Sequence, residues 1–117
     1  MQTTFELKID QSKLDNMGPR VREALQQAIG KIAKDIEADA KTTVPVDTGF
    51  LKNSILARQV TPMLWRVNVG ANYGIYVEFG TRFMAARPYF VPAVDKMRSV
   101  FESVVAQAAK RAIEGEG

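Results

Sequence analysis

Two long amphipathic segments constrain the fold of this chain more than any other feature. In the first, apolar side chains recur every three or four residues: Val21, Leu25, Ile29, Ile32, Ile36 and Ala40. This spacing places them on one face of an α-helix, with charged residues on the other face. Pro19 suits a first helical turn and Pro45 disfavours helical geometry at Val44, so we predict a helix from about Pro19 to Thr43.

The second segment starts near residues 88–92 and carries one apolar stripe up to Gly115: Val94, Met97, Phe101, Val104 and Ala108. We predict a second long helix there. A helix of ~24 residues is ~36 Å long, and a compact chain of this size has a diameter of ~35 Å. Each helix would span the whole body. Either the helices cover each other, or part of their apolar surface meets a neighbouring subunit.

The remaining regular patterns indicate strands. "TFELKID" alternates apolar and polar residues, which predicts a half-buried first strand. "SILARQV" and "WRVNVGA" predict a hairpin joined by "TPML", where Pro62 favours a turn. A short helix is expected over Ile75 to Phe79, ended by Gly80. The predicted fold class is α+β, a small antiparallel sheet of three or four strands packed against two long helices, in a single domain over residues 1–117.

The composition excludes several classes of function. The chain has no Cys and no His, which removes disulfides, zinc fingers and Ser-His or Cys-His relays. We expect no catalytic residues, no cofactor and no metal. No run approaches the ~20 apolar residues that cross a bilayer, and "MQTTFELKID" lacks the pattern of a signal peptide. We therefore expect no membrane association and synthesis in the cytoplasm.

The positive charge of the chain is concentrated in its centre. The net charge is +3, and residues 47–90 carry five Lys or Arg against two Asp or Glu, whereas the flanking parts are balanced. A weakly charged surface explains this bias, and so does contact with an anionic partner. A small basic nucleic-acid-binding protein is therefore an alternative function.

The stretch "VPVDTGFLKNSI" raises a remote alternative, because Asp-Thr-Gly is the signature of aspartic proteases. A dimeric protease of that class needs an almost all-strand fold, whereas this chain is dominated by helix. We favour a structural role, in which Asp47 caps one helical turn formed by Thr48, Gly49, Phe50 and Leu51. Gly49 would allow close packing, and Phe50 and Leu51 are expected in the core.

A second conspicuous stretch, residues 73–90, holds six of the ten aromatic residues. Rings and arginines at this density are typical of protein interfaces, although the rings can also fill a core or stack on nucleic-acid bases. We assign three residues to the core: Tyr76, Val77 and Phe79. We assign five to a subunit or partner interface: Tyr73, Arg82, Phe83, Arg87 and Tyr89.

Taken in order, these stretches resemble the bacteriophage head-tail connector family, variously called neck, tail-completion or minor tail component. The resemblance covers most of the chain from about Ala28 onward. It is carried by the following residues: Pro45, Asp47, Thr48, Gly49, Leu51, Ser54, Ile55, Tyr73, Tyr76, Val77, Glu78, Phe79, Gly80, Thr81, Arg87, Pro88, Phe90, Pro92 and Ala93. Members often have Ala-Pro where this chain has Gly74-Ile75, which affects only how the short helix begins.

The resemblance implies a non-enzymatic virion protein that forms a ring, such as a hexamer or dodecamer, in the phage neck. Its implied partners are the connector or stopper protein on the head side and the tail-terminator or tail-tube protein on the tail side. Non-specific DNA contact in the channel is also implied, as is assembly in the host cytoplasm. Glu78 either pairs with Arg82, Arg87 or a neighbouring subunit's Arg, or is solvated.

Overall fold

The computed structural model describes residues 3–15, 17–44 and 49–114. The elements follow one another as β1 (Thr3–Lys8), α1 (Gln11–Leu14), α2 (Pro19–Thr43), α3 (Gly49–Asn53), β2 (Ile55–Thr61), β3 (Leu64–Val69), α4 (Gly74–Phe79) and α5 (Val91–Ile113). This composition confirms the predicted α+β class with two long helices. The short helix α1 was not predicted.

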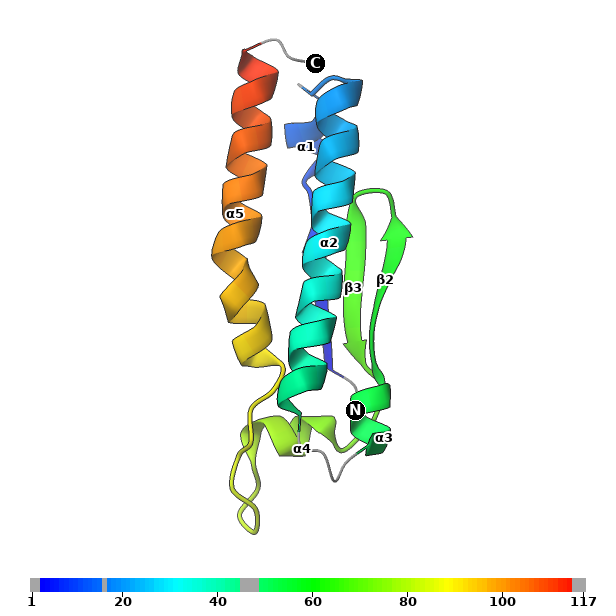
Figure 1. Ribbon diagram of the computed structural model, residues 1–117, viewed down its shortest axis with the longest axis vertical. Helices are drawn as coiled ribbons and strands as arrows, with labels where there is room; N and C mark the ends of the chain where they lie inside the picture. The colour runs from blue at the N-terminus through cyan, green and yellow to red at the C-terminus, as the bar shows by residue number, and fades with distance from the viewer. Residues whose placement is uncertain (1–2, 16, 45–48, 115–117) are drawn as a thin grey trace.

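The described part of the chain is a rod of 56 × 22 × 21 Å. The long helices α2 and α5 run side by side along it, and α3, α4 and the segment after α4 form one end (Figure 1). A helix of 25 residues is ~37 Å long, so the rod is set by its helices. Our premise of a near-spherical chain was wrong, because the two helices lie parallel to the long axis and contact each other.

The three strands form one antiparallel sheet in the order β1-β3-β2. The central strand β3 is flanked on both sides, so that Val67 faces Phe5 on one neighbour and Ala57 on the other. β2 and β3 form the predicted hairpin, whose turn is tighter than expected and consists of Pro62 and Met63. The sheet has three strands among the residues described, the lower of the two numbers predicted.

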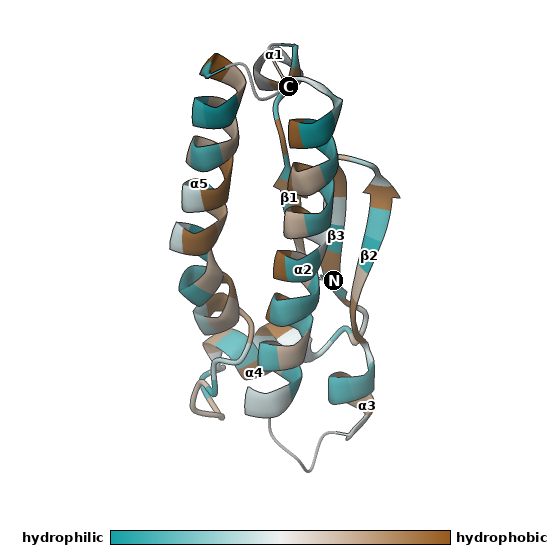
Figure 2. Ribbon diagram, turned by 45° about the horizontal axis from the view of Figure 1, so that its top comes forward, coloured by the Kyte–Doolittle hydropathy of each residue, from teal (hydrophilic) through white to brown (hydrophobic). Residues whose placement is uncertain are grey.

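The helices cover one face of this sheet. Helix α2 packs on β2 and β3, while Met97 and Phe101 of α5 pack against the same core as Phe5 and Leu7 of β1. Figure 2 shows apolar residues where α2 and α5 face each other. All six members of the predicted α2 stripe are buried, whereas three of the five in α5 are only partly buried. The apolar stripe of α5 is therefore more exposed than that of α2.

Close packing between α2 and the sheet depends on one glycine. A Cβ placed on Gly30 would lie 2.9 Å from a ring carbon of Trp65. The ring of Trp65 thus rests directly on the helix backbone at this turn. No helix in the described ranges is long and apolar enough to cross a bilayer.

We predict that Ile36→Ala lowers the free energy of unfolding by ~2–5 kcal/mol, because the side chain is fully buried beneath the sheet and leaves a cavity. Urea unfolding measures this as a lower midpoint with an unchanged slope. Leu56→Ala, on an exposed side chain of β2, is the control and should change stability by less than ~0.5 kcal/mol. Equal losses in both variants would contradict the assigned core.

Candidate interaction surface

The predicted aromatic segment forms one end of the rod. It comprises α4, a loop that projects beyond the helices, and the start of α5, with α3 beside them (Figure 1). We call residues 81–87 of this loop the arm.

Helix α4 lies against the core through its first residue. A Cβ on Gly74 would meet the Tyr89 Oη at 2.7 Å and the Val69 Cγ1 at 2.8 Å. Glycine at this position therefore lets the helix approach β3 and Tyr89 closely.

Tyr89 belongs to this internal contact. Its side chain is 1% exposed, and its hydroxyl donates a hydrogen bond of 2.9 Å to the Gly74 carbonyl oxygen. Our assignment of Tyr89 to an interface was therefore wrong. The segment after the arm turns back under α4, and this return brings the ring inside. Burial raises the pKa of Tyr89 from 10.0 to about 12, with further contributions from the nearby Glu78 and Tyr73.

Glu78 joins α4 to the start of α5. Its Oε1 accepts hydrogen bonds from the backbone N–H groups of Tyr89 at 3.2 Å and Phe90 at 2.7 Å, and its Oε2 accepts one from Val91 at 3.1 Å. The side chain is 3% exposed, so the solvated alternative for Glu78 was wrong. Phe90, the N-cap residue of α5, forms no side-chain cap hydrogen bond. The Glu78 carboxylate therefore caps α5 from a different helix, α4.

Gly80 lies directly before the arm and sets the turn that leads into it. Gly80 has a φ of 78°, and its N–H donates to the Tyr76 carbonyl oxygen at 2.7 Å. A Cβ there would lie 2.8 Å from the Ala86 nitrogen and 2.9 Å from the Met84 oxygen. Both the positive φ and the close backbone require glycine. The prediction that Gly80 ends the short helix at Phe79 is confirmed.

The arm is a tight backbone turn. Thr81 and Met84 exchange two backbone hydrogen bonds of 2.8 and 3.2 Å, and the Thr81 hydroxyl accepts the Phe83 N–H at 3.1 Å. Arg87 donates its N–H to the Val77 carbonyl oxygen at 2.8 Å, which ties the end of the arm to α4. Arg82 and Phe83 occupy the tip, with the guanidinium 5.0 Å from the ring centroid. Phe83 is 87% exposed.

The two faces of α4 decide which rings are exposed. Gly74, Val77 and Glu78 are buried on one face, while Tyr73, Tyr76 and Phe79 follow one another at intervals of three on the opposite face and are exposed. The assignment of Val77 to the core is confirmed, and those of Tyr76 and Phe79 were wrong. This spacing of three is the signal in the sequence that would have separated them.

Helix α3 contributes one more exposed ring. Leu51 is fully buried, as predicted, but Phe50 is 71% exposed and stacks on Tyr73 with ring centroids 6.3 Å apart. The expectation that Phe50 enters the core was wrong, because adjacent residues in a helix point in different directions. Asp47 and Thr48 lie outside the described residues, while Gly49 begins α3. A Cβ on Gly49 would meet no atom within 4 Å, so the expectation that this glycine allows close packing was wrong. Pro88 is exposed between the arm and Tyr89.

One end of the rod therefore presents an apolar surface, which we call the aromatic end. It consists of the exposed side chains of Phe50, Tyr73, Tyr76, Phe79, Phe83, Met84 and Val91. Of the five predicted interface residues, Tyr73, Arg82, Phe83 and Arg87 lie on exposed positions of this end. Exposed apolar patches rimmed by charge are typical of protein contact sites. The interface assignment of these four residues stays a prediction.

The aromatic end offers a surface for hydrophobic contact. Among the described residues, no group of three or more acidic side chains is placed to hold a metal ion. The buried carboxylate of Glu78 is already engaged by three backbone donors. What the arrangement provides is a preformed apolar surface with Arg82 at its tip.

Comparison with known proteins identifies the family of this chain. The family model described as "Bacteriophage HK97-gp10, putative tail-component" matches residues 11–80. The chain belongs to the HK97-gp10-like family of bacteriophage tail components. Searches of the curated proteins and of the solved structures found no match to it.

The match to the HK97-gp10-like family spans α1 to α4 and ends at Gly80. It includes the "VDTG" stretch and Glu78, and it stops just before the arm and α5. This confirms the resemblance to a phage tail family. A structural role in the phage tail, and hence in the virion, follows from membership.

We predict that Glu78→Ala lowers the free energy of unfolding by ~3 kcal/mol, because two buried N–H groups and one partly buried N–H group lose a charged acceptor. Glu78→Gln should lose less, since one amide oxygen remains. Urea unfolding measures both, with Glu23→Ala, an exposed acidic residue of α2, as the control. A Glu78→Ala protein as stable as the control variant would rule out the capping role.

Tyr89 should make stability depend on alkaline pH. The pKa of Tyr89 is raised in the folded protein to about 12. The contribution of its neutral hydroxyl to the free energy of unfolding is therefore complete below pH ~10 and is lost as the pH rises toward ~12. At pH 8, Tyr89→Phe should cost ~1 kcal/mol through the lost hydrogen bond. The difference in unfolding free energy between wild type and the variant should narrow above pH ~10 and reverse near pH ~11.

Chemical unfolding of wild type and Tyr89→Phe at several pH values tests this. Tyr76→Phe alters an exposed ring and is the matched control. A difference between wild type and Tyr89→Phe that stays constant with pH would contradict the burial of this hydroxyl.

Proposed function

We propose that this tail component forms a ring in the phage neck that joins the DNA-filled head to the tail. The observation that carries the proposal is the aromatic end, where seven large apolar side chains are exposed at one end of a rigid rod. A monomeric protein rarely leaves so many rings in water at one place. In an assembly, neighbouring subunits would cover this end and remove its apolar side chains from water.

The construction of this end suits an adaptor. The arm is fixed by its own backbone hydrogen bonds, and Glu78 fixes the start of α5 to α4. A preformed contact surface loses little conformational entropy on binding. Rings of identical subunits repeat such a contact around an axis, so that several modest contacts add to one stable assembly.

The partners in this proposal are further copies of the chain and the rings above and below. On the head side it meets a connector or stopper protein, and on the tail side a tail-terminator or tail-tube protein. A ring of six or twelve subunits assembles in the host cytoplasm and becomes part of the virion. If the channel admits DNA, basic side chains of the ring meet phosphates without reading sequence.

A basic outer sheet face supports this DNA contact. Arg58 and Arg66 are direct cross-strand partners. Arg66 forms an ion pair with Glu6, whereas Arg58 has no ion-pair partner among the described residues of this face. A nucleic-acid-binding protein that acts alone would use the same residues. It would bind DNA tightly as a monomer, with strong salt dependence, whereas the adaptor binds DNA weakly. The protease alternative requires a nearly all-strand fold, which differs from this α+β fold.

We predict that antibody-gold labelling of virions that carry this protein marks the junction between head and tail. Native mass spectrometry of the purified protein, alone and with neck and tail proteins, should give a closed oligomer of defined subunit number. Labelling of the major tail-tube protein in the same preparation provides the positional control.

Two results would contradict the proposal. Label along the tail tube or at its distal tip would place the protein elsewhere in the tail. A strict monomer that joins no virion particle would exclude a ring.

A further inference from the structure

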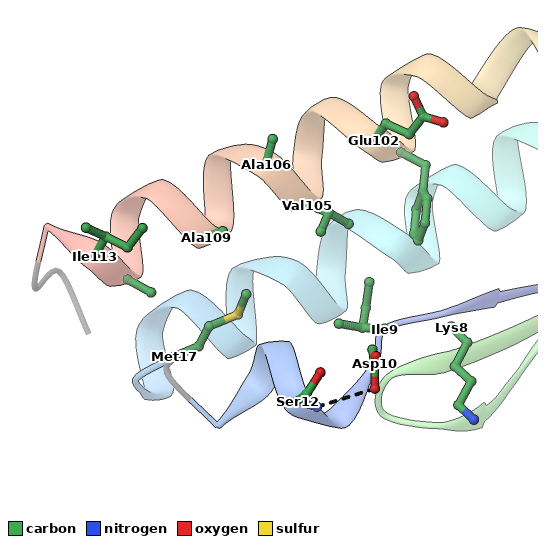
Figure 3. Close-up of a pocket in the computed structure, with 12 residues that line it drawn as sticks. Lys8, Ile9, Asp10, Ser12, Met17, Glu102, Val105, Ala106, Ala109 and Ile113 are labelled. Carbon is green, nitrogen blue, oxygen red and sulfur yellow. Dashed lines mark hydrogen bonds between the residues drawn. The ribbon is translucent and has the colours of Figure 1, made fainter.

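The rod carries an apolar groove near the end opposite to the aromatic end. It has a volume of about 870 Å³ and lies between the C-terminal half of α5 and the segment formed by β1 and α1 (Figure 3). Ile9 and Met17 point into it from one side and Val105 from the other. Charged residues stand at its margin: Lys8, Asp10 and Glu102.

The walls of this groove are held in place. Arg22 donates two hydrogen bonds across the turn between α1 and α2, to the Leu14 carbonyl oxygen at 2.6 Å and to the Met17 carbonyl oxygen at 3.0 Å. The Asp10 carboxylate accepts the Ser12 N–H at 3.4 Å. The groove is therefore part of the fold rather than a gap at a loose chain end.

An apolar side chain at the groove is left without cover. Ile113, on the last turn of α5, lines the groove and is 86% exposed. Among the described large apolar side chains, only Phe83 at the arm tip is more exposed. The two most exposed apolar side chains thus belong to opposite ends of a rod 56 Å long.

We propose that the arm of one copy inserts Phe83 into the groove of the next copy. This inference deepens the proposed ring function and rests on it for the number of copies. The occupant is a second copy because the arm and the groove are complementary in polarity and in charge. The arm, residues 81–87, carries two arginines and no acidic residue, and Asp10 and Glu102 at the groove outnumber Lys8.

The arm cannot fill the groove of its own chain. Helix α5 starts beside the arm and runs the length of the rod before its last turn reaches the groove (Figure 1). The contact must therefore join the arm end of one copy to the groove end of another. Such a head-to-tail contact uses two different surfaces, and it closes into a ring when the rotation between copies completes a full turn.

The area of the contact suits an assembly rather than a stable dimer. One buried aromatic side chain covers ~150–250 Å², and a stable pairwise interface buries ~1,200 Å² or more in total. Phe83 and Met84 alone fall short of that area, so neighbouring rings of the aromatic end must add to it. In a closed ring every copy makes the contact twice, once with its arm and once with its groove.

Mixing two variants tests the contact. Phe83→Asp damages the arm, and Ala109→Arg blocks the groove, while Ile113→Lys is a second groove variant on an exposed side chain. Each variant alone should self-associate ~30-fold or more weakly than wild type, because one anchor is lost at every contact. An equimolar mixture should form a one-to-one heterodimer through the intact arm of one and the intact groove of the other. Analytical ultracentrifugation measures both, after circular dichroism has verified folding.

Covalent trapping gives an independent readout. The chain has no cysteine, so Ala85→Cys, on an exposed residue of the arm, combined with Ala109→Cys introduces the only two thiols and keeps the Phe83 ring. Mild oxidation should produce a ladder of disulfide-linked oligomers. The control pairs Ala85→Cys with Ser103→Cys, an exposed residue of α5 that does not line the groove, and it should give little ladder.

The outcomes separate this contact from the proposed function. Oligomers that persist unchanged in both the arm and the groove variants, or a ladder no stronger than the control, would overturn the contact while leaving the ring intact. A specific ladder from a protein that gold labelling places away from the neck would support the contact and contradict the function. Binding of a purified tail protein that Ile113→Lys abolishes, with no ladder, would identify a different occupant of the groove and overturn the proposal.

Discussion

The structure depends on one buried carboxylate. Glu78 accepts three backbone hydrogen bonds from the segment that begins α5, a helix whose first residues bring no cap of their own. Pro92 has no N–H to satisfy, so this carboxylate meets much of the donor demand of the first turn. Its negative charge also lies at the N-terminal end of α5, where the helix dipole stabilises an anion. Because the carboxylate comes from α4, one side chain fixes α4, α5 and the arm between them in a single arrangement.

This arrangement links the fold to the proposed role. A mobile arm would present Phe83 in many positions and would lose conformational entropy on binding. The Gly80 turn and the Thr81 to Met84 hydrogen bonds instead hold the ring outward. Helix α5 then carries the groove at its far end. The two surfaces that we propose to meet are therefore built at a set distance and orientation on one rigid rod, as repeated assembly requires.

The long helices and the hairpin could be predicted from the sequence because their signals are local and repeat many times. The six apolar residues that recur at helical spacing in α2 are all buried, and the sequence has a proline near each end of this segment. The burial of the aromatic side chains was harder to predict. A helix as short as α4 shows only weak periodicity, and which of its side chains are buried depends on which face packs against the core. Tyr76 is exposed because it lies on the outer face of α4. Tyr89 is buried for a different reason, because the chain returns to α4 after the arm and the Tyr89 hydroxyl bonds to Gly74. The partners of Glu78 lie 11 to 13 residues away, and no local pattern reports such a bond.

Amide hydrogen exchange at Tyr89, Phe90 and Val91 tests the central claim most directly. If the Glu78 carboxylate holds these three N–H groups in a buried site, they should exchange nearly as slowly as the amides in the middle of α2, since both would open only with global unfolding. Exchange at the rate of the exposed residues of the arm would show that this junction opens freely. That result would contradict an account in which a single carboxylate orders the end of the rod.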